Sequence, residues 1–275
     1  MPWFAVSFTS LDDTMEFMSQ LLAGKTAIIL GVANKWSIAY AIADSYRREG
    51  ARLILTYQGE RQKATVEDLG KELGAARILN CDVTNAAEVE TLVKELSGEK
   101  LDVLVHSIAY ANPDSLSKPF LETTRDAYLQ AMEVSAYSLV SVSRALAPLM
   151  TEGGAIMTLT YLGSIRVIPN YNVMGVAKAA LEAGVRYLAA DLGARNIRVN
   201  AISAGPIKTA SARGIKDFSK VLSGVAAMTA LKRNTDPAEV ADTAVFLGSS
   251  LGRGVTGNVI YVDAGFQMMG LQPPE

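Results

Sequence analysis

Short apolar runs alternate along this chain with longer segments in which apolar residues recur every three or four positions. The apolar runs predict strands over 25–30, 52–56, 77–81, 101–107, 154–159, 197–202 and 256–262. The spacing between these runs predicts helices over 37–49, 62–73, 85–96, 123–150, 172–192 and 237–248. A glycine follows several of these helices, which is a common way for a helix to end.

This alternation predicts an α/β protein built on one Rossmann-like, doubly wound, seven-stranded parallel sheet. The strands are almost continuously apolar, as expected when helices cover both faces of a sheet. No repeat, linker or shift in composition divides the chain, so we expect one domain over 23–270, with an extension (1–22) and a tail (271–275). Sheets of this kind bind ligands beyond the carboxyl ends of their strands, so we expect the functional residues in the segments that follow the strands.

The composition excludes several classes of site and partner. The 275 residues include one cysteine, Cys81, and one histidine, His106. A disulfide framework needs paired cysteines, and structural zinc sites use several Cys or His ligands, so neither is expected and no metal is predicted. Lys and Arg number 26 against 28 Asp and Glu, for a net charge of −2. Nucleic acid is not an expected partner, because proteins that bind it normally carry a strong basic excess.

No segment predicts contact with a membrane or passage across one. No apolar run approaches the roughly 18 residues that a membrane-spanning helix needs. Residues 1–22 contain no Lys or Arg and are interrupted by Asp12, Asp13 and Glu16, which argues against a secretory leader. With one cysteine and no leader, the cytoplasm is the expected compartment.

The segment after the first strand has features of a phosphate-binding turn. Gly31 begins the turn, and Ser37, Ile38 and Ala39 follow where the first helix is expected to start. The unpaired N–H groups and the positive dipole end of a helix suit a pyrophosphate. An ordinary strand-to-helix turn is the alternative, because the full glycine pattern of dinucleotide-binding turns is missing.

The segments after the next three strands could bind the rest of a dinucleotide. Gln58 could hydrogen-bond ribose hydroxyls, which favours NADH, whereas Arg61 could instead pair with the 2′-phosphate of NADPH. Asp82, followed by Val83, could contact the adenine or cap the next helix. Residues 107–109 are small and apolar, which suits the close approach of a flat cofactor.

The most informative segment follows the fifth strand. Tyr171, Met174 and Lys178 have the spacing i, i+3 and i+7, which places them on one face of a helix. A phenol beside an ammonium could donate a hydrogen bond to a developing oxyanion, and the positive charge is expected to lower the pKa of the phenol. A core tyrosine next to a surface lysine is the alternative.

Motifs throughout the chain carry a family resemblance. Within residues 20–268 they include GVANKWSIAYAIA, TYQGER, HSIAYA, NYNVMGVAK, IRVNAISAGPIKT and TGNVIYVDAGF. They resemble the short-chain dehydrogenase/reductases, and specifically the bacterial enoyl-acyl-carrier-protein reductases. Most of the wider family carries Tyr-x-x-x-Lys preceded by a serine. Here Met174 takes the place of that tyrosine and Tyr161 the place of the serine, while the acidic phenol lies at Tyr171, which argues against ketone reduction.

The resemblance implies reduction of the trans-2 double bond of enoyl-acyl-carrier-protein thioesters in fatty acid biosynthesis, with NADH expected over NADPH. It implies that Tyr161, Tyr171 and Lys178 are catalytic. The implied cofactor-binding residues are Gly31, Ser37, Ile38, Gln58, Asp82, Val83, Ser107, Ile108, Ala109, Lys178, Ile207, Lys208, Thr209, Ala210 and Ser211. The implied substrate-binding residues are Tyr110, Ala111, Tyr161, Met174, Ile215 and Phe218.

The resemblance also implies a lid, a docking surface and an assembly. Residues 208–228 resemble a cover that closes over the acyl chain. Arg213, Lys216 and Lys220 could dock the acidic carrier protein, although a solvated basic face is the alternative. Members of this family are usually homotetramers.

Two other functions stay open at this point. One is a different short-chain reductase that acts on another carbonyl or activated alkene. The other is a non-catalytic dinucleotide sensor, which the fold alone would permit. The joint presence of Tyr161, Tyr171 and Lys178 argues against a sensor.

Overall fold

The structure is a computed structural model that describes residues 20–207 and 218–270. Its strands are β1 (Thr26–Leu30), β2 (Arg52–Tyr57), β3 (Arg77–Asn80), β4 (Val103–His106), β5 (Gly154–Thr160), β6 (Ile197–Ala204) and β7 (Val259–Val262). They pair in parallel into one seven-stranded sheet of order β3-β2-β1-β4-β5-β6-β7. The chain runs outward from β1 to β3 and returns to β4 beside β1, so the strand order reverses between β1 and β4. The predicted doubly wound parallel sheet is confirmed.

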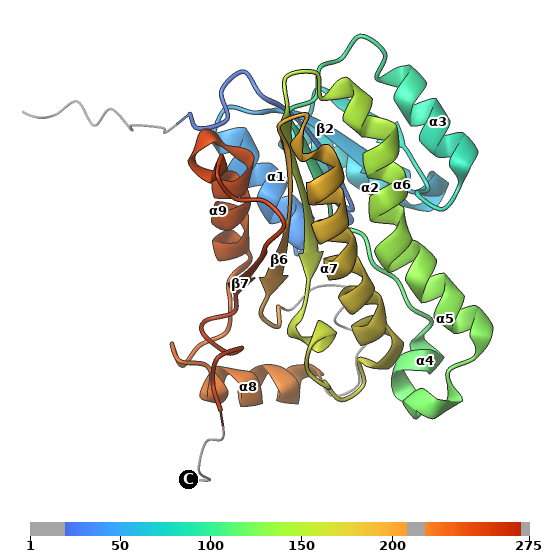
Figure 1. The fold of residues 1–275 in the computed structure, drawn as a ribbon, viewed down its shortest axis with the longest axis vertical. Helices are drawn as coiled ribbons and strands as arrows, with labels where there is room; N and C mark the ends of the chain where they lie inside the picture. Colours follow the sequence, from blue (N-terminus) through green and yellow to red (C-terminus); the bar gives the residue numbers. More distant parts are fainter. Residues whose placement is uncertain (1–19, 208–217, 271–275) are drawn as a thin grey trace, which may run out of the picture.

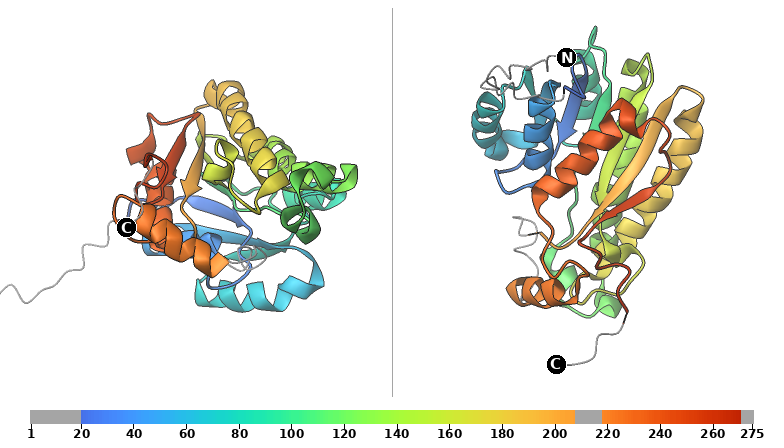
Figure 2. Two further views of the ribbon diagram at one scale, coloured as in Figure 1. Left: turned by 90° about the horizontal axis from the view of Figure 1, so that it is seen from below. Right: turned by 90° about the vertical axis from the view of Figure 1, so that its left-hand side faces the viewer.

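Helices cover both faces of this sheet. They are α1 (Ile38–Arg48), α2 (Gly59–Glu72), α3 (Ala86–Glu95), α4 (Pro113–Ser117), α5 (Arg125–Met132), α6 (Ser138–Leu146), α7 (Asn172–Gly193), α8 (Phe218–Met228) and α9 (Pro237–Gly248). Helices α1, α2 and α9 contribute to the core on one face, and α3, α6 and α7 to the core on the other (Figures 1 and 2). Helices α4 and α8 lie at the end of the molecule toward which the strands point (Figure 1).

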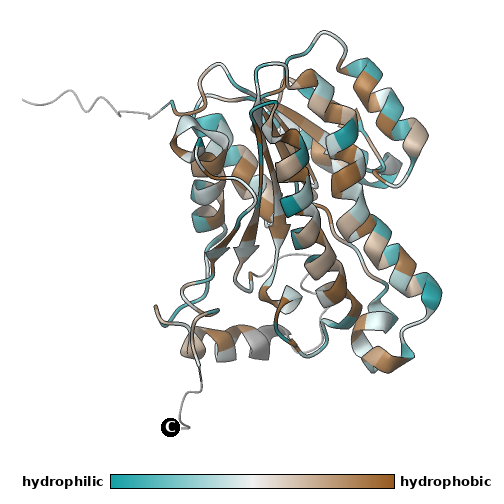
Figure 3. Ribbon diagram, viewed as in Figure 1, coloured by the Kyte–Doolittle hydropathy of each residue, from teal (hydrophilic) through white to brown (hydrophobic). Residues whose placement is uncertain are grey.

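The two cores follow from the period of the strands. Along β1, Ala27 and Ile29 enter the core beneath α1 and α9, whereas Ile28 and Leu30 enter the core beneath α3, α6 and α7. Successive side chains of a strand point to opposite faces, so a continuous apolar run fills both cores. Each fully buried aliphatic side chain contributes about 1.5–3 kcal/mol. Figure 3 shows the hydrophobic residues concentrated on the central strands.

Side-chain caps fix the starts of several helices, among them α1, α3 and α9. Ser37 caps α1 by accepting from the Tyr40 N–H, and Asn85 caps α3 in the same way. Helix α9 begins with a capping box between Asp236 and Glu239, and it carries Pro237 in its first turn. These caps satisfy N–H groups that the helix itself leaves free, which explains why these starts could be predicted.

The helical stretch expected over 123–150 is confirmed, because residues 125–149 are continuously helical, but it is not α-helical throughout. A π-helical turn (Glu133–Tyr137) separates α5 from α6, and a short 3₁₀ turn containing Pro148 follows α6. Within and after the π turn, Ser135 hydrogen-bonds the backbone of Tyr110 and Ser138 hydrogen-bonds the His106 ring. Proline lacks the N–H that a continuing α-helix needs, so α6 cannot extend beyond it.

One residue of the expected N-terminal extension belongs to the folded core instead. Leu22 is fully buried against α1 and α9. The phenol of Tyr46 in α1 donates to the carbonyl oxygen of Ala244 in α9 at 2.9 Å. Between residues 20 and 207 and from 218 to 270, no helix is both long and apolar enough to cross a membrane.

Candidate active site

The turn after β1 packs directly on the end of β4, where the strand order reverses. Gly31 has a φ of +98°, and a Cβ atom there would lie 2.1 Å from the carbonyl oxygen of Ser107. Only glycine combines this backbone conformation with so close an approach. The structure therefore joins two of the predicted cofactor segments at the point where doubly wound sheets bind ligands.

The start of α1 presents free backbone N–H groups beside this turn. Ser37 Oγ accepts from the Tyr40 N–H at 3.1 Å and donates to the carbonyl oxygen of Asn34 at 2.7 Å. Among the described residues, none accepts a hydrogen bond from the N–H of Ile38 or Ala39. These two donors and the positive end of the helix dipole can bind a phosphate.

The ends of β2 and β3 meet through the two polar residues expected to bind the adenosine half. Gln58 Nε2 donates to Asp82 Oδ2 at 2.8 Å, and the Thr84 N–H and hydroxyl both donate to Asp82 Oδ1. Burial raises the pKa of Asp82, but these hydrogen bonds outweigh it and the pKa falls below its usual value. Asn85 caps α3, so Asp82 orders the turn before that helix instead of capping it.

Two tyrosines form the centre of the site. Tyr161 directly follows β5, and Tyr171 directly precedes α7. Their rings pack edge to face, with centroids 5.0 Å apart and planes at 76°. Gly163 makes this packing possible, because a Cβ atom there would lie 2.4 Å from the Tyr171 ring. The sequence spacing thus brings two phenols together at the carboxyl end of β5.

The expectation that Tyr171 has a lowered pKa is wrong. Burial raises its pKa above the ordinary range, and the neighbouring Tyr161 and Glu182 raise it further. Burial also raises the pKa of Tyr161 to about 12, with Asp263 adding to the effect. A low-dielectric environment disfavours the phenolate, and Lys178 does not offset it. Both phenols are therefore neutral hydrogen-bond donors near pH 7.

Lys178 is a buried residue of the site and not a surface lysine. Its side chain lies on α7 with 5% of the residue exposed, and Nζ donates to the carbonyl oxygen of Leu159 at 2.8 Å. That acceptor lies two residues before Tyr161, so the same strand end holds the ammonium and the phenols. Burial lowers the pKa of Lys178 to about 8, although Glu182 acts in the opposite direction.

Comparison with known proteins shows to which protein family a chain with this site belongs. A family model described as Enoyl-(Acyl carrier protein) reductase matches residues 31–267. The chain belongs to this family. The enoyl-[acyl-carrier-protein] reductase [NADH] FabI of Bacillus subtilis is 52% identical over 256 residues, which cover 91% of this chain and 99% of that relative. The FabI of Escherichia coli is 44% identical over 257 residues, covering 92% of this chain and 98% of its own.

Solved structures of the family share the whole fold. The enoyl-acyl carrier protein reductase of Bacillus cereus with NADP⁺ and indole naphthyridinone has a TM-score of 0.90 at 51% identity, covering 91% of this chain and 99% of its own. The enoyl-acyl carrier protein reductase of Anaplasma phagocytophilum in complex with NAD has a TM-score of 0.88 at 41% identity, and the match covers 92% of this chain and 95% of that one. An NADH-dependent enoyl reductase of fatty acid biosynthesis is therefore confirmed over a ketone reductase or a sensor.

The structure describes some of the residues predicted to bind substrate and cofactor on this side of the site, but not all of them. Met174 and Ala111 are buried in one cluster against which Tyr171 packs, whereas Tyr110 is 47% exposed. Ile207 is buried at the end of the described segment. The predicted residues Lys208, Thr209, Ala210, Ser211, Arg213, Ile215 and Lys216 lie outside the described residues, and the side chains of Phe218 and Lys220 do as well.

Two buried polar groups, Glu182 and His106, lie behind the enoyl reductase site, and sequence reasoning missed only Glu182. Thr160 Oγ1 donates to Glu182 Oε1 at 2.7 Å. The ring nitrogens of His106 lie 3.0 Å from Thr158 Oγ1 and 2.8 Å from Ser138 Oγ. The sequence did contain a signal for Glu182, because it is a charged residue four positions after Lys178 on the buried face of an otherwise apolar helix.

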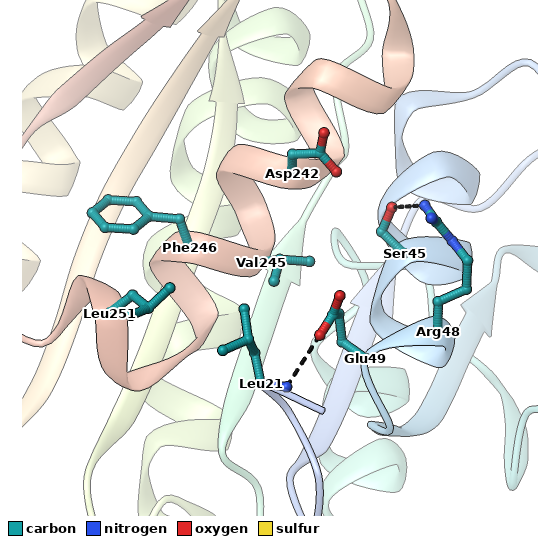
Figure 4. Close-up of a pocket in the computed structure, with 8 residues that line it drawn as sticks. All are labelled: Leu21, Ser45, Arg48, Glu49, Asp242, Val245, Phe246 and Leu251. Atoms are coloured by element: carbon teal, nitrogen blue, oxygen red, sulfur yellow. Dashed lines mark hydrogen bonds between the residues drawn. The ribbon is translucent and has the colours of Figure 1, made fainter. Parts of the chain in front are cut away.

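Cavities occur at both ends of the molecule. One of about 450 Å³ beside Tyr171 is lined by loop 163–168 and by the start of α7. Another, of about 210 Å³, lies between Leu21 and the ends of α1 and α9 (Figure 4). Helix α1 starts at the carboxyl end of β1 and runs back, so the second cavity is at the end of the sheet away from the reductase site.

Proposed function

We propose that this enoyl reductase uses Tyr171 as the hydrogen-bond donor to the substrate and Lys178 as the residue that holds the nicotinamide half of NADH. The observation that carries the proposal is the joint position of two neutral phenols and a buried ammonium at the end of β5. The residues fit a dinucleotide. Gly31 permits close approach, the N–H groups of Ile38 and Ala39 suit its pyrophosphate, and Gln58 suits its ribose.

Bound NADH supplies a hydride to the β-carbon of the trans-2-enoyl thioester. Negative charge then develops on the thioester oxygen, and the Tyr171 phenol donates a hydrogen bond to it. Because the pKa of Tyr171 is raised, the phenol retains its proton while it stabilises this charge. The enolate takes a proton from solvent water at the α-carbon, which leaves hydroxide to the solvent and gives the saturated thioester.

Lys178 and Tyr161 support this chemistry. The Lys178 ammonium binds the ribose hydroxyls beside the nicotinamide, and burial confines it to one orientation. Tyr161 lines the site and buttresses the Tyr171 ring through their edge-to-face contact. Residues Ser107, Ile108 and Ala109 contribute the small surface against the cofactor.

Residues 208–228 act as the lid, and their basic residues Arg213, Lys216 and Lys220 dock the acidic acyl-carrier protein. The assembly is a homotetramer formed through α5, α6 and α7. The outer surface of these helices carries exposed Leu129 and Tyr137 and an apolar groove of about 570 Å³, which supports burial against another copy. The cytoplasm is the compartment.

One assay tests the central proposal. NADH oxidation is followed at one wavelength with a medium-chain enoyl thioester, with acetoacetyl thioester and with NADPH in place of NADH. We expect turnover only of the enoyl substrate, faster with NADH. The Lys178→Ala variant should lose both NADH binding and turnover, and full activity in that variant would overturn the assignment.

A further inference from the structure

A buried carboxylate that the proposed mechanism does not use lies one helical turn from Lys178. Glu182 follows Lys178 by four residues on α7, and the two residues are 6% and 5% exposed. Removing charged groups from water costs several kcal/mol each unless other groups compensate. A carboxylate and an ammonium buried on the same helix face therefore compensate each other.

Two hydrogen bonds fix this helix face on the end of β5. The Thr160 hydroxyl donates to Glu182 Oε1 at 2.7 Å, and Lys178 Nζ donates to the carbonyl oxygen of Leu159 at 2.8 Å. Leu159 and Thr160 are consecutive residues of the strand. Neither charge can move away from the other without breaking its own contact with β5.

The other titratable groups around Lys178 carry little opposing charge. His106 of β4 is neutral, because burial and the Lys178 charge lower its pKa to about 3. Tyr161 and Tyr171 are neutral phenols with raised pKa values. On this side of the site, the strand β4 and the segment that joins β5 to α7 thus supply no negative charge.

The β7 side supplies one further carboxylate, but it is used elsewhere. Asp263 accepts hydrogen bonds from the N–H groups of Gly265, Phe266 and Gln267. Tyr261 of β7 is a phenol with a raised pKa, owing first to burial and then to Glu182 and Asp263, with Arg166 acting against it. Glu182 is the described group that counters the effect of burial on Lys178.

We propose that Glu182 is a positioning residue that keeps the Lys178 side chain protonated and held on β5 for its contact with the cofactor. The inference rests on the proposed role of Lys178 in binding NADH. Thr160 is part of the same device, because its hydroxyl anchors the carboxylate. Glu182 itself need not touch the cofactor or the substrate.

The test uses Glu182→Gln, which keeps the size of the side chain and an oxygen that can accept from Thr160 but removes the charge. Asp191→Asn is the matched control, because it removes the same charge from an exposed position on the same helix. The Lys178 titration is followed in the cofactor-free chain by NMR of [ε-¹³C]lysine, with its signal assigned from its loss in Lys178→Met. The Kd of NADH is measured by fluorescence across the same pH range.

In Glu182→Gln we expect the Lys178 titration to move to lower pH by about one unit, as for loss of an opposite charge nearby. The alkaline weakening of NADH binding should move with it, while Asp191→Asn behaves like the parent chain. An unchanged Lys178 titration in folded Glu182→Gln overturns the inference.

Should Glu182→Gln fail to fold, Glu182→Asp withdraws the carboxylate by one methylene group and is expected to give a smaller shift in the same direction. A parental titration in Glu182→Asp would also overturn the inference. Normal NADH binding in Lys178→Ala would instead overturn the proposed role of Lys178, so the two failures are distinguishable.

Discussion

Replacing Tyr171 by phenylalanine separates the chemistry of the phenol from the packing of its ring. The ring contacts Tyr161 edge to face at 5.0 Å and lies against Gly163, and phenylalanine keeps both contacts. Among the described residues, none hydrogen-bonds the Tyr171 hydroxyl, so the substitution breaks no bond within the fold. We expect the free energy of unfolding to change by about 0.5 kcal/mol or less.

The effect on turnover should be far larger. Loss of one hydrogen-bond donor to a developing oxyanion typically costs about 2.7–4 kcal/mol, a fall of about 10²–10³ in kcat. The assay is NADH oxidation with a saturating enoyl thioester, accompanied by the Kd of NADH and the Tm of each variant. Tyr187→Phe is the matched control, because this tyrosine also lies on α7 and is 76% exposed.

We expect Tyr171→Phe to lose turnover while keeping the parental Tm and NADH affinity, and Tyr187→Phe to keep all three. A Tyr171→Phe variant that retains more than about a tenth of the parental kcat would refute the assignment, because an oxyanion donor contributes more than that. Parallel loss of activity and NADH binding would show that the phenol serves the cofactor site.

Three further outcomes follow from the geometry. Gly31→Ala should lower the Tm and weaken NADH binding, since its φ of +98° and the 2.1 Å approach to Ser107 both disfavour a Cβ atom; a parental Tm contradicts this. The free energy of unfolding should fall as the pH drops from about 6.5 to 3, because the unfolded chain protonates His106 and the native chain does not until about 3; urea unfolding of His106→Gln should show a flatter pH dependence. Because the pKa of Lys178 is lowered to about 8, the unfolded chain binds more protons than the native chain between pH 8 and 10.5. The contribution of Lys178 to the free energy of unfolding should therefore increase as the pH rises through that window, whereas NADH affinity should fall as the ammonium loses its proton. A Kd for NADH that stays constant to pH 10 contradicts the expected loss of affinity.

Much of the fold could be predicted because its elements carry local signals. The apolar strands filled both cores, and the caps at Ser37 and Asp236 marked helix starts. Part of the site was also predictable from local spacing. The spacing of Tyr171 and Lys178 predicted one helix face for both, and the structure has Tyr171 immediately before α7 and Lys178 within it.

The rest depended on contacts between distant segments. The π turn in the expected helix over 123–150 occurs where Ser135 and Ser138 bond to residues near the end of β4, and periodicity does not register such bonds. The pKa of Tyr171 depends on how deeply the ring is buried, which its neighbours in the sequence do not reveal. Thr160, the hydrogen-bond partner of Glu182, likewise lies at the end of a strand, 22 residues away in the sequence.

The contact between α1 and α9 has a consequence for synthesis of the chain. Tyr46 bonds to Ala244, so the first helix completes its core only with the last one. On the ribosome, α9 emerges only after almost the entire polypeptide has been synthesised, so the apolar side of α1 that packs against it stays uncovered until then. The nascent protein thus exposes the apolar surface that α9 covers in the complete fold for most of its translation. Premature termination before α9 leaves a fragment prone to aggregation.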